Sequence, residues 1–141
     1  MCIVSNENIQ VSDGNVSVLK VLVGKGRYCF APYRNSDGSK ENSAHKPYFV
    51  PTREAKSQIT NIIAESAIDS FCDGFGISCF TDVQAAKKYS KIVSDSEGVE
   101  TKLVRFRLPF GSLYQKGTIK KGFKGSGLPA VRCTQLEPVV G

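Results

Sequence analysis

The 141-residue chain has no tryptophan, one methionine and one histidine. None of its apolar runs approaches the roughly 18–20 residues that a membrane-spanning helix requires. Its first residues also lack the basic segment and apolar stretch that mark a secretory signal. From these absences we expect a cytoplasmic protein with no membrane partner.

Motifs for metal or disulfide chemistry are scarce as well. The five cysteines are an odd number, no two of them have C-x-x-C spacing, and His45 is the single histidine. A closed zinc site would need an unusual set of distant ligands, so we expect no metal and no cofactor. The simplest interpretation is a set of reduced, mostly buried thiols in a reducing compartment. The cysteines are Cys2, Cys29, Cys72, Cys79 and Cys133.

What the chain does have is a local excess of positive charge. Nineteen Lys and Arg residues face thirteen Asp and Glu residues, which gives a net charge of +6. Residues 1–97 hold eleven of each sign, whereas residues 98–141 hold eight basic and two acidic side chains. The whole excess therefore lies in the C-terminal third, where an anionic partner would be attracted.

The composition and the pattern of apolar residues predict one α+β domain over residues 1–141. Hydrophobic residues at 40% and charged residues at 23% are typical of a globular domain. The pattern predicts an antiparallel or mixed sheet with about two helices packed on one side. The expected strands are 16–23, 27–31, 48–50, 76–80, 101–109 and 130–136, the expected helices 51–74 and 82–93, and the expected loops 33–47 and 115–127.

Two of these segments carry the clearest local signals. Thr81 and Gln84 fit a capping box, in which the threonine oxygen and the glutamine side chain satisfy backbone amides at a helix start. Residues 101–109 alternate, which predicts a half-buried strand with Phe106 on the inner face and Arg105 on the outer face. We expect the 27–31 strand to form a hairpin with the 16–23 strand that precedes it.

The basic C-terminal third supplies a candidate anion-binding site. Arginines stand on predicted strands, lysines stand on a glycine-rich loop, and two aromatic rings between them could stack on a base. The anion-binding candidates are Arg105, Arg107, Lys116, Lys120, Lys121, Lys124 and Arg132, and the stacking candidates are Tyr114 and Phe123. The turn at 24–27 and the segment after it add secondary candidates, Arg27, Tyr33 and Arg34, although the spacing of a phosphate-binding P-loop is absent.

Catalysis is the alternative that these residues leave open. His45 lies in a polar loop, and a cysteine could meet it in space. Cys2 would become an N-terminal thiol beside a free amine if Met1 were removed. Glu137 is the only acidic residue on the last strand. A divergent ribosyl- or acyl-transferring enzyme would use Glu137, or Cys2 with His45.

Two family resemblances follow from longer motifs. Four pieces of the chain resemble small uncharacterised bacterial and bacteriophage proteins that open Met-Cys. They are the Met-Cys-Ile-Val start, the Val-Leu-Lys-Val-Leu strand at 18–22, the Ala31-Pro-Tyr-Arg34 segment and the Gly76 to Tyr89 segment. The strand entering a helix at 76–81 is similar in outline to ADP-ribosyltransferase-like folds. That second resemblance implies a glutamate on a late strand, and Glu137 is the only acidic residue available there.

The function expected from the sequence is therefore a small, non-enzymatic basic module that binds an anionic ligand. A nucleotide, for example a signalling nucleotide in a phage–host setting, comes first, and nucleic acid comes next. The alternatives are the divergent transferring enzyme and a protein-interaction module with no small ligand. A homo-oligomer is compatible with each of these hypotheses.

Overall fold

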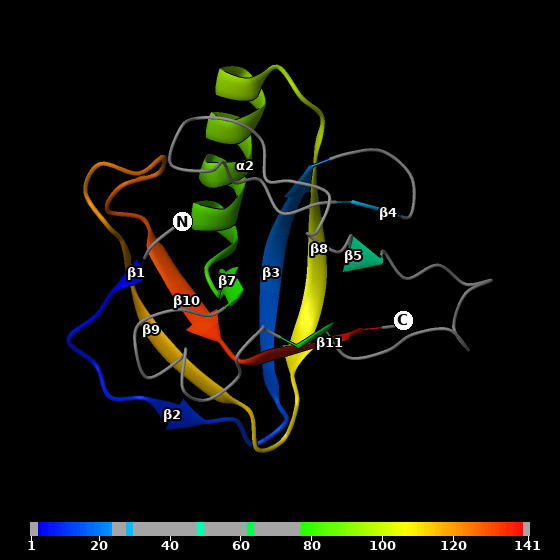
Figure 1. The fold of residues 1–141 in the computed structure, drawn as a ribbon, viewed down its shortest axis with the longest axis vertical. Coiled ribbons are helices and arrows are strands. Elements are labelled where there is room, and N and C mark those ends of the chain that lie inside the picture. Colours follow the sequence, from blue (N-terminus) through cyan, green and yellow to red (C-terminus); the bar gives the residue numbers. More distant parts are fainter. Residues whose placement is uncertain (1–2, 24–27, 30–47, 50–61, 64–76, 140–141) are drawn as a thin grey trace.

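The computed structural model describes residues 3–23, 28–29, 48–49, 62–63 and 77–139. These residues form three antiparallel sheets and one helix (Figure 1). The elements are β1 (Ile3–Val4), β2 (Gln10–Val11), β3 (Val16–Val23), β4 (Tyr28–Cys29), β5 (Tyr48–Phe49), β6 (Ile62–Ile63), β7 (Ile77–Cys79), α2 (Val83–Glu97), β8 (Thr101–Leu108), β9 (Leu113–Ile119), β10 (Pro129–Cys133) and β11 (Gln135–Pro138).

The two larger sheets share a core. One sheet has the order β1-β9-β10-β7, with β2 also paired to β9, and the other has the order β3-β8-β11-β6. Leu19 of β3 exchanges two backbone hydrogen bonds with Phe80, at 2.6 and 2.8 Å, and this joins the sheets on one side. Thr134 alone separates β10 from β11, so the chain also passes directly from one sheet to the other at this residue.

Thr134 is held at this corner by β9. Its backbone N–H donates to the Leu113 carbonyl, and its hydroxyl accepts from the Leu113 N–H, both at 3.0 Å. The expected single strand over 130–136 is therefore wrong. Its two parts pair in different sheets, because a corner residue redirects the backbone between them.

Eleven buried side chains fill the space between the two sheets, and we call them the inner cluster. They come from both sheets and include Phe106, which is completely buried. The members are Val18, Leu22, Ile77, Cys79, Val104, Phe106, Leu108, Tyr114, Val131, Cys133 and Leu136. A second group, the helix cluster, lies under α2 and consists of Leu19, Val21, Phe80, Ala85, Ala86, Tyr89, Val93, Ile119 and Ala130.

Strand β3 contributes to both clusters, which explains its nearly continuous apolar sequence. Val18 and Leu22 face the inner cluster, and Leu19 and Val21 face α2. A strand buried on both faces has no solvent side on which polar residues would alternate. The predicted bounds of β3 are confirmed, and those of β8 differ by one residue.

Two sequence predictions about helices and hairpins are changed by the structure. Ile62 and Ile63, placed inside the expected 51–74 helix, lie instead in β6 and pair with β11. The rest of that expected helix lies outside the described residues. Tyr28 and Cys29 pair with β5 rather than with β3, so the hairpin predicted with the preceding strand is wrong at these two positions. In each case a distant strand provides the partner, which local sequence does not reveal.

Helix α2 begins at Val83, one residue later than predicted, and its N-cap is Asp82 rather than Thr81. The carboxylate of Asp82 accepts from the N–H groups of Gln84 and Ala85, at 2.8 and 3.1 Å. The capping box on Thr81 is therefore wrong, because Asp82 occupies the N-cap position. The helix also runs past the predicted end at residue 93, and Gly98 ends it in the left-handed conformation at φ 63°. Within the described residues, no helix has the length and apolar character needed to cross a membrane.

The position of the cap gives a direct prediction. Replacing Asp82 by alanine should lower the free energy of unfolding by about 1 kcal/mol, because two amides at the helix start lose their acceptor. Urea unfolding followed by circular dichroism measures the change. The matched control is Thr81→Ala, for which we expect almost no loss; the reverse order of the two effects would restore the capping box.

Candidate anion-binding site

The most basic described segment is the turn between β9 and β10, residues 120–128, which we call the hairpin tip. The Gly127 N–H donates to the Ile119 carbonyl at 2.9 Å, and the Ile119 N–H donates to the Leu128 carbonyl at 3.0 Å. Two shorter turns lie within this segment. The Phe123 N–H donates to the Lys120 carbonyl at 3.2 Å, and the Ser126 N–H donates to the Phe123 carbonyl at 3.1 Å. The tip is thus a hydrogen-bonded turn. The loop expected over 115–127 is wrong for its first five residues, which belong to β9.

The hairpin tip is fastened to helix α2 at two points. Gly125 has φ 77°, and a Cβ at this position would lie 2.9 Å from Cδ2 of Tyr89. The tip backbone therefore lies directly against a helix side chain. Lys124 forms an ion pair with Glu97, the last residue of α2. The tip therefore packs against α2 mainly through the close approach at Gly125, and the partly exposed ion pair adds little to it.

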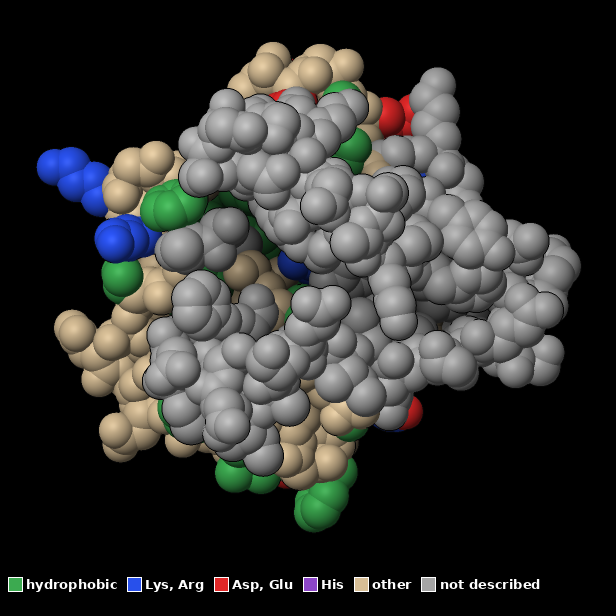
Figure 2. Space-filling model, viewed as in Figure 1, with side chains coloured by type: hydrophobic (Ala, Val, Ile, Leu, Met, Phe, Trp, Pro, Cys, Tyr) green, Lys and Arg blue, Asp and Glu red, His purple; other side chains and the backbone are tan. Residues whose placement is uncertain are grey.

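Two lysines and an aromatic ring remain exposed at the hairpin tip. Lys120 and Lys121 are exposed, and neither forms an ion pair within the described part of the chain. Phe123 is 42% exposed, which leaves part of its ring accessible. Figure 2 shows basic side chains beside hydrophobic ones at the edge of the molecule where Figure 1 places the β9–β10 turn. The tip thus combines cations with an aromatic surface.

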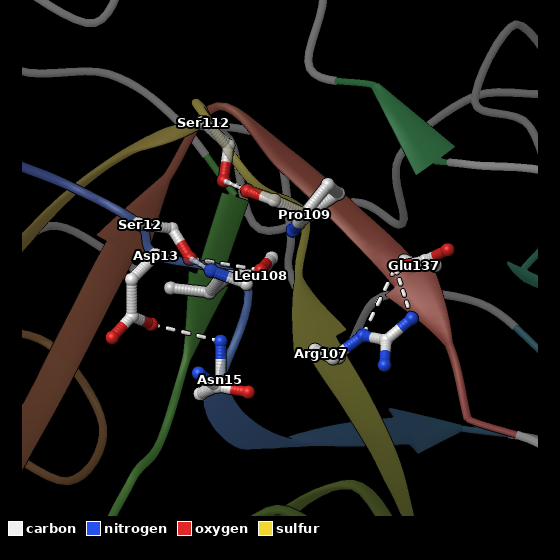
Figure 3. A network of polar contacts seen from close by, with 9 residues as sticks. Ser12, Asp13, Asn15, Arg107, Leu108, Pro109, Ser112 and Glu137 are labelled. Atoms are coloured by element: carbon white, nitrogen blue, oxygen red, sulfur yellow. Dashed lines mark hydrogen bonds and ion pairs between the residues drawn. The ribbon is translucent and has the colours of Figure 1, made fainter.

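The two strand arginines lie elsewhere and have partners of their own. Arg105 and Arg107 stand on the outer face of β8, as the alternation predicts. Arg105 donates to the Ser17 hydroxyl at 2.8 Å. Arg107 donates twice to one carboxylate oxygen of Glu137, at 3.0 and 2.8 Å (Figure 3). Both groups of this ion pair are partly exposed, so the pair contributes little to stability.

Arg132 is buried rather than displayed at the surface. It is 6% exposed, and its Nε and one terminal nitrogen donate to Oε1 of Gln115, at 2.9 and 2.6 Å. Strands β7 and β3 lie between Arg132 on β10 and Arg105 on β8. The structure therefore does not bring the three arginines together with the hairpin-tip lysines.

The remaining candidates differ in their surroundings. Tyr114 is 8% exposed within the inner cluster, and its hydroxyl donates to Gln10 at 2.9 Å. Lys116 is exposed on β9. The secondary candidates and the two residues of the catalytic alternative lie outside the described residues; they are Arg27, Tyr33, Arg34, Cys2 and His45. In the described part of the chain, no three His, Cys, Asp or Glu residues form a group that could hold a metal.

One buried basic residue was missed by the sequence reasoning. Lys20 lies in the middle of β3, is 6% exposed, and donates from Nζ to the Ser78 carbonyl at 2.6 Å. Burial lowers the pKa of its amine below the usual 10.5. The sequence signal that could have identified Lys20 as buried is its position in the strand. It lies two residues from Val18 and two from Leu22, so it points to the same buried face as they do.

A prominent apolar side chain stands at the turn between β8 and β9. Phe110 is 84% exposed, yet the turn beneath it is held firmly. Ser12 donates from its hydroxyl to Leu108 at 2.8 Å, and the Ser112 hydroxyl donates to Pro109 at 2.7 Å (Figure 3). These bonds hold the backbone of the turn, whereas the ring itself projects into solvent; a single exposed ring of this kind does not by itself mark a protein interface.

Comparisons of the chain with protein-family models, with curated proteins and with solved structures give no match. The function is therefore argued from the geometry of the site.

Proposed function

We propose that the protein binds nucleic acid through the hairpin tip. The observation that carries the proposal is the presentation of Lys120 and Lys121 beside the exposed ring of Phe123, on a turn anchored to α2. Lysine side chains neutralise backbone phosphates, and an aromatic face stacks on bases of any identity. A strand of nucleic acid offers both groups in repetition.

The arrangement of the other cations favours nucleic acid over a single nucleotide. A nucleotide pocket of the kind expected from the sequence needs the arginines of β8 and β10 to converge with the lysines. Arg107 is paired with Glu137, and Arg132 is buried against Gln115. Among the described residues, Lys120 and Lys121 therefore have no arginine beside them with which to enclose a single nucleotide. A nucleic-acid strand needs no enclosing pocket, because it can lie along an exposed surface.

The test is fluorescence anisotropy with a labelled 12-nucleotide oligothymidylate, measured at several salt concentrations. Replacing Lys120 and Lys121 together by glutamine should weaken binding about tenfold or more at low salt. It should also reduce the slope of log affinity against log salt by about 1.4, the value for two lost phosphate contacts on a single strand. The slope is diagnostic because it counts the counterions that binding releases.

The matched control is Lys87→Gln with Lys88→Gln, which removes the same charge from the exposed face of α2. We expect this variant to bind nearly as well as the unchanged protein. Equal weakening of the two variants would mean that net charge alone attracts the oligonucleotide and would contradict the proposal. A saturable thermal shift with ATP, together with no affinity for the oligonucleotide, would replace it by the single-nucleotide alternative.

A further inference from the structure

Three reactive groups in or directly beside the inner cluster are not used in nucleic-acid binding. They are the amine of Lys20 and the thiols of Cys79 and Cys133. Both cysteines are completely buried, and Lys20 is 6% exposed. A lysine in an apolar cluster is costly because its charge loses water, so a chemical reason for its position is worth seeking.

The strand register places the two thiols on one face as diagonal neighbours. In the pairing of β7 with β10, Cys79 lies opposite Val131 and Cys133 lies opposite Ile77. All four side chains belong to the inner cluster. The thiol of Cys133 donates to the Ile77 carbonyl at 3.6 Å, so it is oriented along β7. The two sulfurs therefore come from adjacent strands into the same part of the core.

Lys20 reaches into this thiol pair from a third strand. Its Nζ donates to the carbonyl of Ser78, the residue directly before Cys79. Burial lowers the pKa of the Lys20 amine, and the charges of the two cysteine sulfurs act on it in the opposite direction. Burial, followed by hydrogen bonding to Cys79, raises the pKa of the Cys133 thiol. These pKa directions favour the uncharged forms of Lys20 and Cys133 in the metal-free core, so the case for a site rests on the positions of the three groups.

We propose that Cys79 and Cys133 bind a soft monovalent metal ion of the copper(I) class, with the Lys20 ammonium as the adjacent counter-charge. Thiolates select copper(I) among biological metals because both partners are polarizable. Zinc generally requires four ligands, and within the described residues no third His, Cys, Asp or Glu joins this pair.

The charges of the proposed site balance. Each thiol releases one proton to solvent before the core closes, and both sulfurs bond to the metal, so two thiolates and one monovalent cation form a complex with a single negative charge. The negative charge of this complex would favour the ammonium form of Lys20, whose single positive charge then balances it. The copper enters and stays as copper(I), so no electron is transferred. Because both sulfurs are completely buried, the ion must be bound while the chain folds.

The decisive experiment measures copper retained after folding. The full chain is refolded without oxygen in the presence of copper(I) acetonitrile complex, and the product is passed over a column in the presence of the copper(I) chelator bathocuproine. A variant carrying Cys2→Ser, Cys29→Ser and Cys72→Ser keeps only the proposed ligands. It should retain one copper ion per chain and show an ultraviolet thiolate-to-copper absorption.

The reverse variant, Cys79→Ala with Cys133→Ala, should lose that ion. Equal retention by the two variants, or no retention by the refolded unchanged protein, would overturn the proposal. If the triple serine variant fails to refold, the unchanged protein is compared with Cys79→Ala alone. A drop of one copper per chain then supports the site, and unchanged stoichiometry refutes it.

The counter-charge has its own test. Lys20→Met should weaken copper(I) retention roughly ten- to hundredfold in competition with the chelator. This is the usual effect of removing a group that contacts the ligands of a metal rather than the metal itself. Lys91→Met, on the exposed face of α2, is the control and should leave retention unchanged. Equal retention by both variants would refute the role of Lys20.

Discussion

Replacing Phe106 by alanine should lower the free energy of unfolding by about 3–5 kcal/mol, the largest stability effect that we expect in this protein. Phe106 is completely buried in the inner cluster, where the side chains of both larger sheets meet. Alanine would leave a cavity in the space that joins the sheets, and rigid strands on both sides limit its collapse. A small domain has about 5–15 kcal/mol of net stability, so this loss is a large fraction of it.

Urea unfolding followed by circular dichroism measures the loss, and the chain offers a matched control. Phe110 follows the end of the same strand but is 84% exposed. Phe110→Ala removes the same atoms and should change the free energy of unfolding by no more than about 0.5 kcal/mol. Similar losses for the two variants would show that Phe106 does not occupy the core that joins the sheets.

The second large effect is expected at Gly125, where the hairpin tip meets α2. Gly125→Ala should cost about 2–4 kcal/mol, because it combines an unfavourable left-handed conformation with a steric clash. The added Cβ would lie 2.9 Å from Cδ2 of Tyr89 and 3.1 Å from Cδ1 of Ile119. Both of these side chains are buried in the helix cluster and have little room to move. The tip would have to move away from the helix.

The control for this variant is Gly122→Ala in the same turn. Gly122 also has a positive φ, 97°, but its added Cβ meets nothing within 4 Å. This substitution includes the backbone strain without the clash, and we expect a loss of about 1–2 kcal/mol. The difference between the two variants therefore measures the packing of the tip on α2. No difference in urea unfolding would contradict that contact.

The same pair of variants tests the link between structure and the proposed function. Gly125→Ala displaces the lysines and the ring of Phe123 from their anchored position, so oligothymidylate affinity should fall. Gly122→Ala leaves the contact with Tyr89 in place and should bind more tightly than Gly125→Ala. Equal affinities would show that the anchoring of the tip is irrelevant to binding.

Local sequence was sufficient where a segment carries its own pattern. The apolar run of β3, the alternation of β8 and the start of α2 within one residue could all be read from the chain, because side-chain periodicity follows the backbone geometry of each element. The predicted antiparallel pairing agrees with the structure, but the described residues form two larger sheets with one helix rather than one sheet with about two helices. Even so, Asp82 rather than Thr81 caps the helix, since neighbouring polar residues compete for the same amides and only the backbone path decides between them.

The chain by itself determined the excess of positive charge in its last third and the glycines that permit the hairpin tip. Only the tertiary structure decided which of those charges are displayed. It paired Arg107 with Glu137 and Lys124 with Glu97, buried Arg132, and left Lys120 and Lys121 exposed. It also brought Lys20 to two cysteines that lie more than fifty residues away in the sequence. Such pairings depend on which strands become neighbours, and strand neighbours are selected by the packing of the whole core rather than by adjacent residues.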